Sequence, residues 1–389
     1  MSSLSFDNTS IAFNSQTNEE LKASYRLFCA MNNTTLVKWT SPFARLIVLF
    51  PNPIRWQIRE TIFKQFCGGE TVKQCESTLQ KLTNYEVGSI LDYSVEGKQN
   101  EDTYLQTTNE IVQLIQTTAA DTRIPIYVFK ITGIGPMEIL EKLHAKIALS
   151  ETETESYTAL QQRLDTIISA AVKVDKPIMI DAEESWIQDP IDALCTHYMQ
   201  KYNTTKAYVY NTFQLYKTDS LAKLQQLTKL ATKEKFLVGA KLVRGAYMEK
   251  ERKRAAEMNY PSPIHKNKKA TDKDFNAAVA YCLQNTQQVH IVIGSHNEES
   301  NLLATQYMQQ YTISPSDKRV YFSQLLGMSD NISFNLAKAH YQVAKYVPYG
   351  PLPDVIPYLT RRAQENSSVE GQISRELTLI KQEINSRGL

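Results

Sequence analysis

The sequence predicts an α/β protein, a (β/α)8 barrel preceded by a helical arm, and two observations carry that prediction. Short runs rich in Val, Ile, Tyr and Leu recur from about residue 87 onward, each followed by a helix-like stretch. The runs are nearly continuously apolar, which is typical of parallel strands buried on both faces and joined by right-handed helical crossovers. Eight such units indicate a barrel. The runs are residues 87–94, 124–131, 176–183, 206–213, 236–247, 289–297, 319–326 and 340–350.

The first 85 residues are predicted to form an N-terminal helical arm, and residues 86–389 the barrel domain. A chain of 389 residues exceeds the ~250 of a typical barrel, which leaves room for such an arm. Gly68 and Gly69 end one predicted helix, and Thr71 is the expected N-cap of the next. Helices are predicted at residues 21–33, 42–50, 53–66 and 71–82, and a last amphipathic helix at 370–387.

The composition argues against several classes of protein. With 43 basic and 41 acidic residues well mixed along the chain, the formal charge of +2 creates no field suited to nucleic acid. The longest apolar stretch near the N-terminus, Leu46 to Phe50, is far shorter than the ~20 residues that a membrane-spanning helix requires. The first residues lack the features of a signal or transit peptide, so a cytoplasmic location is expected. We expect the arm to pack across the barrel, with peripheral contact at the inner face of the membrane as the alternative.

Cysteine, histidine and glycine patterns exclude further kinds of site. The five cysteines form no CxxC pair and are predicted to be reduced thiols, mostly buried. The six histidines show no HxH or HExxH spacing, so no metal site is expected. The sequence Gly133-Ile-Gly135-Pro136 fails the GxGxxG pattern, so a dinucleotide would not be held as in a Rossmann fold.

Polar residues end the buried runs, and in a barrel the loops after the strands build the active site. Solubility alone does not explain polar groups at the ends of buried strands, so the pattern favours an enzyme. The endings are Asp92, Lys130, Asp181, Asn211, Lys241 with Arg244, His296, Gln324 and Tyr346.

A helix predicted after the eighth strand carries a pair of arginines. Tyr358, Arg361, Arg362 and Glu365 are spaced to share one face of that helix. Two guanidinium groups on one face suit bidentate binding of a carboxylate or phosphate. The alternative is a solvated arginine pair held by Glu365, and the place of the helix after the last strand favours a binding role.

Two further motifs follow predicted strands. In Lys241 to Ala255, an apolar strand ends in two cations and a Gly-Ala pair that lets a flat ligand approach the backbone. Residues 249–254 of this motif are predicted to form a solvated helix face. In Ile180 to Trp186, clustered carboxylates could act as a base, hold a metal or neutralise Lys130 and Lys241.

Five separated motifs resemble the proline dehydrogenase family. They are KLVRGAYMEKERKRA, IDAEESW, VYNTFQLY, SHNEESN and YLTRRAQENSS, and the resemblance runs from about residue 85 to 370. It implies a distorted (β/α)8 barrel with non-covalent FAD that oxidises L-proline to 1-pyrroline-5-carboxylate and passes electrons to a membrane quinone. Hydride would pass from the ring carbon bonded to nitrogen onto flavin N5, with the proline amine neutral.

The resemblance also implies a role for each matching position. Catalytic roles fall to Asp181, close to the substrate carboxylate, and to Lys241, near the reactive edge of the flavin, where a cation stabilises the reduced ring. Glu365 would hold one arginine. Substrate contacts are implied for Lys130, Tyr346, Tyr358, Arg361 and Arg362, with Leu325 or a neighbour completing the wall around the ring. Cofactor contacts are implied for Ala182, Asn211, Lys241, Arg244, Gly245, Ala246, Lys268, Ser295 and His296.

Some positions depart from the family's pattern, and two rival functions remain. Many bacterial members have Arg where Lys241 stands and Gln where Asn211 stands, which weakens the flavin roles implied for both. A gating carboxylate is expected after the first strand, where Glu96 is a candidate. Relatives that oxidise hydroxyproline carry a smaller residue at Tyr346, so this chain favours proline. The other alternative is a flavin-free barrel that binds an anionic metabolite.

Overall fold

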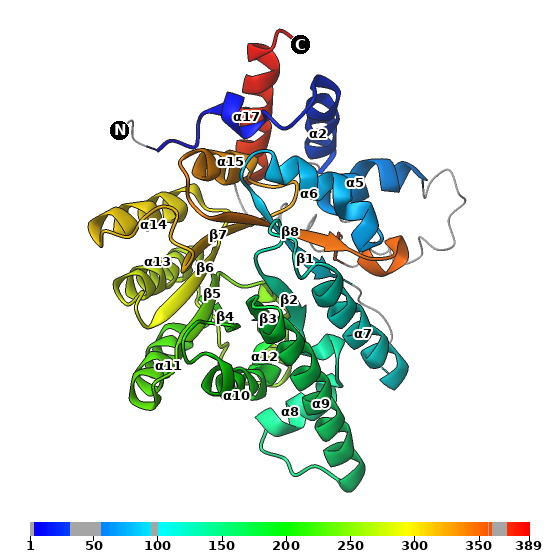
Figure 1. Ribbon diagram of the computed structural model, residues 1–389, viewed down its shortest axis with the longest axis vertical. Helices are drawn as coiled ribbons and strands as arrows, with labels where there is room; N and C mark the ends of the chain where they lie inside the picture. The colour runs from blue at the N-terminus through cyan, green and yellow to red at the C-terminus, as the bar shows by residue number, and fades with distance from the viewer. Residues whose placement is uncertain (1–3, 32–55, 95–99, 357, 360–371) are drawn as a thin grey trace. The chain divides into compact units, whose positions relative to one another are not determined.

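The computed structural model describes residues 4–31, 56–94, 100–356, 358–359 and 372–389 (Figure 1). The chain divides into two compact units. Unit 1 comprises Met1–Gly97 and Gln324–Leu389, and unit 2 comprises Lys98–Ser323. The predicted boundary at residue 85 separates an arm from a barrel, whereas the compact units join the first part of the chain to the last. The division into arm and barrel therefore stays a proposal.

Eight parallel strands form one sheet in the order β1-β8-β7-β6-β5-β4-β3-β2, which confirms the predicted (β/α)8 barrel. All eight lie within the predicted runs or extend them by at most one residue, because nearly continuous apolar sequence is what strands covered on both faces require. The strands are β1 (Gly88–Tyr93), β2 (Tyr127–Lys130), β3 (Ile178–Asp181), β4 (Val209–Gln214), β5 (Val238–Val243), β6 (Val289–Gly294), β7 (Val320–Leu325) and β8 (Val343–Tyr349).

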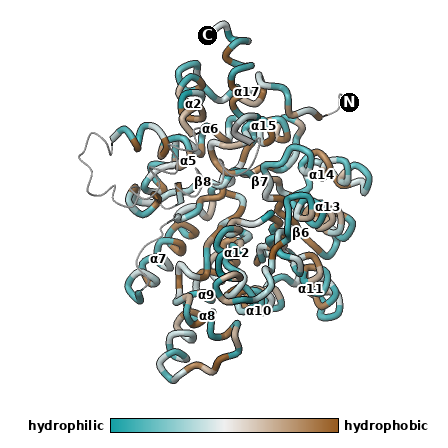
Figure 2. Tube along the Cα trace, turned by 180° about the vertical axis from the view of Figure 1, so that it is seen from behind, coloured by the Kyte–Doolittle hydropathy of each residue, from teal (hydrophilic) through white to brown (hydrophobic). Residues whose placement is uncertain are grey.

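Amphipathic helices cover the strands of unit 2. Figure 2 shows hydrophilic and hydrophobic stretches alternating along outer helices such as α11, α13 and α14, as expected when one face packs on strands and the other meets solvent. Side chains cap several of these helices; the Ser150 hydroxyl and Glu153 form a reciprocal capping box. The helices are α7 (Glu101–Thr117), α8 (Met137–His144), α9 (Glu151–Lys173), α10 (Ser185–Tyr202), α11 (Ser220–Glu234), α12 (Met248–Glu257), α13 (Lys268–Gln284) and α14 (Glu298–Gln310).

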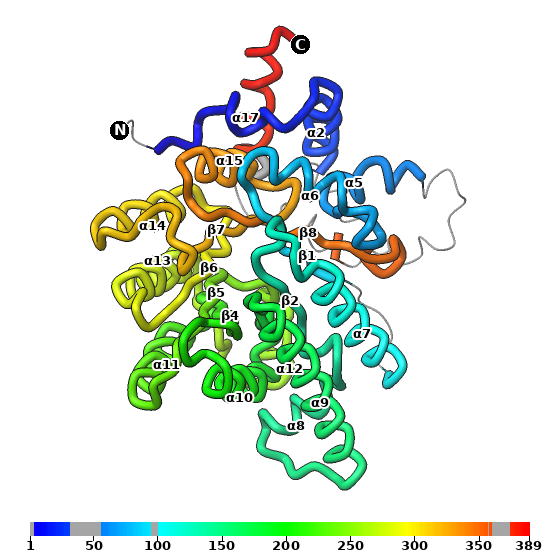
Figure 3. Tube along the Cα trace, viewed as in Figure 1, coloured from blue at the N-terminus to red at the C-terminus, as the bar shows by residue number. Residues whose placement is uncertain are grey.

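Unit 1 brings together segments from both ends of the sequence. Helix α17 packs against α2 and α1, and α1 packs against α15. Figure 3 shows the blue N-terminal helices beside the red C-terminal one. Their shared core includes Phe28, Phe66, Leu352 and Leu379. The helices are α1 (Thr9–Ala12), α2 (Asn18–Met31), α5 (Lys64–Phe66), α6 (Glu76–Thr83), α15 (Asp330–Lys338) and α17 (Gln372–Ser386).

Several helix boundaries in unit 1 match those predicted from the sequence. The helix before Gly68 ends at Phe66, after a π-helical turn at Arg59–Phe63. The Thr71 side chain accepts a hydrogen bond from the Gln74 backbone nitrogen, which confirms the predicted N-cap, although the first turn (Val72–Cys75) is a 3-10 helix. The helix predicted at 42–50 lies outside the described residues. Within the described part of the chain, every helix is too short or too polar to cross a bilayer.

Candidate active site

Two lysines and one aspartate meet near the carboxyl ends of the strands in unit 2. Lys130 and Asp181 are the last residues of β2 and β3 and are partners in the strand register. The Lys241 ammonium lies 2.6 Å from Asp181 Oδ1, and the Lys130 ammonium lies 3.7 Å from Asp181 Oδ2. The side chains of Lys241 and Asp181 are largely buried, whereas that of Lys130 is 29% exposed. Asp181 thus takes the neutralising role considered for this motif, between two cations.

Asn211, predicted as a strand ending and a flavin contact, lies inside β4, which continues to Gln214. It is in register with Ile180 and Ala240, whereas Lys241 is in register with Thr212. Side chains alternate along a strand, so Asn211 faces away from Lys241. Its amide instead donates a 2.8 Å hydrogen bond to Asp192 of α10. The prediction that Asn211 ends its strand was wrong. Its flavin contact stays a prediction, which this orientation does not support.

Arg244 follows β5 and is bound by side chains of three later segments: α13, the loop after β6 and α14. Its guanidinium donates to Asp272 Oδ1 at 2.7 Å, to Ser295 Oγ at 2.8 Å and to Ser300 Oγ at 2.9 Å. The group also lies 4.4 Å from the centre of the Phe275 ring, a cation–π contact. Two predicted cofactor residues, Arg244 and Ser295, therefore meet in the structure.

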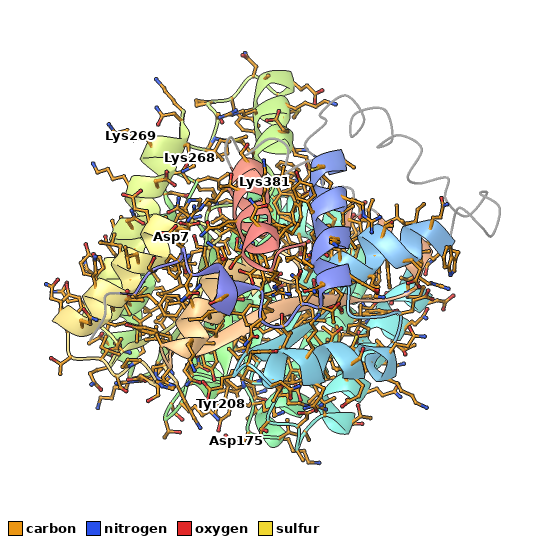
Figure 4. The ribbon with its side chains drawn as sticks, turned by 90° about the horizontal axis from the view of Figure 1, so that it is seen from above. Asp7, Asp175, Tyr208, Lys268, Lys269 and Lys381 are labelled. Carbon is orange, nitrogen blue, oxygen red and sulfur yellow. The ribbon has the colours of Figure 1, made fainter. Side chains whose placement is uncertain are left out.

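Lys268 joins the same cluster through Asp272, to which its ammonium binds from the first turn of α13. Burial raises the pKa of Asp272, but bonds from Lys268 and Arg244 outweigh it and hold that pKa below its usual range. Figure 4 labels the side chains of Lys268 and Lys269 at the start of α13, where both residues are exposed. His296 is half-buried directly after Ser295. An exposed cation beside Arg244 suits the anionic phosphates of a dinucleotide.

The turn at Gly245 and Ala246 requires glycine. Gly245 has φ +141°, and a Cβ there would lie 2.4 Å from the ring of Tyr216. The Ala246 backbone nitrogen donates to Gln214 Oε1 at 3.0 Å, while Gln214 Nε2 donates to the Glu183 carbonyl at 2.7 Å. Gln214 thereby ties the loop after β5 to the loop after β3. The exposed Gly-Ala backbone fits the flat ligand expected from the sequence.

Glu183 is a buried carboxyl beside the lysine–aspartate cluster. It accepts hydrogen bonds from the Thr132 backbone nitrogen, at 3.0 Å, and from the Thr132 hydroxyl. Burial raises the pKa of Glu183 to about 7; the bonds from Thr132 and the nearby Lys130 lower it, and Glu184 raises it. Glu183 therefore links the loops after β2 and β3 and titrates near neutral pH.

Helix α12 was predicted to present residues 249–254 to solvent, and this was wrong for its inner face. Glu251 is fully buried and accepts hydrogen bonds from the backbone nitrogen and hydroxyl of Ser185, at 2.7 and 2.6 Å. Arg254 binds Glu141 and lies 4.6 Å from the centre of the Trp186 ring. One face of α12 therefore packs on α10 and α8 despite its charged sequence. This is possible because charged side chains can be buried when they are paired.

In unit 1, the two predicted ring-contact tyrosines are both buried. Tyr346 lies in β8 in register with Ile90, and its carbonyl accepts a 2.8 Å bond from the Leu326 nitrogen. Tyr358 belongs to the apolar cluster around Phe66 and Leu352. Four predicted residues fall outside the described part of the chain: Arg361, Arg362, Glu365 and the gating candidate Glu96.

No metal-binding group of three or more His, Cys, Asp or Glu side chains occurs among the described residues, and the cysteines there are free thiols. The sequence interpretation missed Gln214, Glu251 and Tyr216 as parts of this site. Gln214 carried a usable signal, since an amide at the end of a buried strand must satisfy both its donor and its acceptor. Glu251 carried none, because its sequence context is that of a solvated helix.

Comparison with known proteins gives the same family as the motifs. A family model described as proline dehydrogenase matches residues 75–375. Proline dehydrogenase 1, mitochondrial, of Dictyostelium discoideum is 32% identical over 379 residues, covering 86% of this chain and 66% of that protein. The Drosophila melanogaster protein of the same name is 40% identical over 245 residues, covering 60% of this chain and 36% of that protein.

Among solved structures, proline utilization A of Bdellovibrio bacteriovorus inactivated by N-propargylglycine superposes with a TM-score of 0.75 at 20% identity. The match covers 93% of this chain and 38% of that one. At this identity it supports the barrel fold and nothing finer. With most of the chain matched by the family model and the motifs in the same order, the chain belongs to the proline dehydrogenase family.

Proposed function

We propose that this protein oxidises L-proline to 1-pyrroline-5-carboxylate with bound FAD, as the first step of proline catabolism. Family membership supplies the reaction class. The observation that carries the proposal is the cluster of Lys130, Asp181 and Lys241, which places two cations around one carboxylate near the strand ends of unit 2. Two cations at one site suit an amino-acid carboxylate and a flavin that becomes anionic on reduction.

The residues of unit 2 fit FAD in three respects. Gly245 holds a backbone conformation that leaves the turn open to a flat ring system. Lys241 supplies a largely buried cation, oriented by Asp181. The linked cations Arg244 and Lys268 suit phosphate. When bound, FAD would accept the hydride from the substrate.

In this proposal, Lys130 binds the substrate carboxylate. Its side chain is 29% exposed, so an anion can approach the ammonium from solvent. Arg361 and Arg362 would complete the carboxylate site, as the family resemblance implies. Lys241 would neutralise the charge that develops on the reduced cofactor, and Asp181 would hold Lys241 in place. Tyr346 and Tyr358 would exclude water from the ring.

No strong general base is required by this proposal, because hydride leaves a substrate whose amine is already neutral. Glu183 and Asp181 are engaged by Thr132 and by the lysines, respectively. Electrons would then pass to a membrane quinone, with peripheral membrane contact. A cytoplasmic location stays a prediction.

The test is a visible absorption spectrum of the purified protein before and after anaerobic addition of L-proline. Bands of oxidised flavin that bleach on addition would support the proposal. A flavin that bleaches with hydroxyproline and not with proline would favour the hydroxyproline alternative. Protein that stays colourless after incubation with FAD would favour the flavin-free barrel.

The arginine pair provides a second test. Replacing Arg361 or Arg362 by Met should raise KM for proline and cost about 2 to 4 kcal/mol of transition-state binding, as for other charge-assisted contacts. An unchanged kcat/KM in both variants would remove these residues from the substrate site. Arg252, exposed on α12, is the matched control.

A further inference from the structure

Glu251 has a position that a surface helix does not require. It is fully buried, although α12 as a whole is rich in charge and has exposed residues on both sides of it. Burying a carboxylate costs free energy unless its oxygens are hydrogen-bonded. Both oxygens of Glu251 are bonded to one residue, Ser185, through its backbone nitrogen and its hydroxyl.

Through this contact, a side chain of α12 caps the N-terminus of α10. Ser185 is the first residue of α10, and the preceding N-cap, Glu184, makes no capping bond with its own side chain. An acceptor is needed there because the first backbone nitrogens of a helix have no partner within it. Glu251 supplies that acceptor from α12. Beside it, the Lys250 ammonium lies 2.7 Å from Glu184, so the same helix also neutralises the N-cap residue.

The two joined helices directly follow the loops that carry the proposed cofactor contacts. Ala182 lies three residues before Ser185, and the Gly245–Ala246 turn lies just before α12. Gln214 connects these same loops at a second point, through the Ala246 nitrogen and the Glu183 carbonyl. Tyr216 packs directly under Gly245, and burial, together with the carboxylates of Glu251 and Glu184, raises its pKa. The spacing between the loops is thus fixed by side chains on both sides of the turn.

We propose that Glu251 is a positioning residue for the flavin site, holding the loops after β3 and β5 at the spacing that FAD requires. The inference rests on the proposed function in that it takes FAD as the ligand. Glu251 acts through Ser185 and α12. Losing it would let the two loops separate, so the cofactor would bind less tightly before any effect on chemistry appears.

The experiment compares holoenzyme variants by the rate at which flavin leaves on dilution, followed by its fluorescence. Glu251→Ala should release flavin at least about tenfold faster than the wild type, equivalent to about 1.4 kcal/mol. Glu251→Gln should stay within about twofold, because its amide oxygen can accept from the Ser185 nitrogen and its amide nitrogen can donate to the hydroxyl. Glu249→Ala, which removes an exposed carboxylate from the same helix, is the matched control.

Equal release rates for Glu251→Ala and wild type would overturn the inference, as would equal losses in Glu251→Ala and Glu249→Ala. If Glu251→Ala does not fold, Ser185→Ala carries the test. It removes the hydroxyl bond and keeps the backbone bond, so release should accelerate about threefold, and an unchanged rate would overturn the inference. A wild-type protein that binds no flavin would instead refute the proposed function, so the two failures are distinguishable.

Discussion

Lys241 on β5 and Lys345 on β8 are two buried lysines with different surroundings. Each ammonium lies 2.6 Å from an aspartate, Asp181 for Lys241 and Asp330 for Lys345. Lys345 also donates to the carbonyls of Met328, at 2.6 Å, and Leu325, at 3.3 Å, and its side chain is only 1% exposed. Its three acceptors belong to the end of β7, the loop after it and the start of α15, so its role is structural.

The partner of Lys241 is different in kind. Asp181 lies at the end of a strand and is shared with Lys130, so one carboxylate serves two cations. The comparison teaches that a charge within an apolar run does not by itself mark a functional site. The distinction lies in the partners: Lys345 binds one aspartate and two backbone carbonyls, whereas Lys241 shares its aspartate with Lys130 near the strand ends.

The largest expected effect tests the structural member of this comparison. Lys345→Met should lower the free energy of unfolding by about 3 to 5 kcal/mol, because it leaves Asp330 and two carbonyls without their buried donor. Urea denaturation measures the loss, with Lys338→Met on the exposed face of α15 as control. A loss under about 1 kcal/mol would mean that the region reorganises, and the comparison would fail.

The next effect concerns Glu183, next to the functional member. Its pKa is raised from 4.5 to about 7, so the protonated form is favoured on folding. Its contribution to stability is complete below pH 4.5 and is lost as pH rises through 7, a change of roughly 3 kcal/mol. Unfolding free energies measured from pH 5 to 8 should fall more for wild type than for Glu183→Gln. Parallel curves would contradict this.

Lys241→Met should reduce activity strongly and stability only moderately. Since Lys130 still faces Asp181 in the variant, we expect a smaller loss of stability than for Lys345→Met, by at least about 1 kcal/mol. The rate of flavin reduction by proline should fall on the order of 100-fold, as when one charge-stabilising donor is removed. Stopped-flow reduction and urea denaturation of the same preparation check both halves. Full activity would make Lys241 structural like Lys345.

The smallest effect tests the neighbour of Lys345. Tyr346 follows it in β8 and lies on the opposite face of the strand. Tyr346→Ser should lower proline turnover and narrow the preference for proline over hydroxyproline by about tenfold, because space for a hydroxyl opens beside the ring. Ratios of kcat/KM for the two substrates measure this. Equal losses on both would mean that Tyr346 does not select the substrate.

The strands were predictable because burial on both faces leaves a strong local signal, and all eight predicted runs contain a strand. The face of the strand to which each side chain points was harder to predict from the sequence. Asn211 and Thr212 are adjacent in sequence and face opposite sides, and only the strand register decides which one shares a face with Lys241. Asp181 lies between Lys130 and Lys241, which was one of the three roles considered for it, and Arg244 and Ser295, both implied as cofactor contacts, lie within hydrogen-bond distance of each other.

The contacts that the sequence could not supply are those between distant elements. Glu251 and Ser185 are 66 positions apart, and nothing near either residue indicates the other. Lys345 lies within a predicted run, but the sequence does not reveal its role, because its acceptors are mainly backbone carbonyls, which every residue has. The roles of Arg361 and Arg362 rest on helical spacing and family resemblance alone.

The makeup of unit 1 has a consequence for the order of folding during synthesis. Gln16 bonds to Asp330 across 314 positions, and Asn331 bonds to the Phe6 carbonyl across 325. Strand β1 pairs with β8, so its partner is translated after all of unit 2. On the ribosome, unit 2 can begin to fold while α2 and β1 still lack their partners. Those early segments stay without their partners until α17 emerges. We therefore expect chaperone binding to protect the N-terminal part of this chain from aggregation more than any other part.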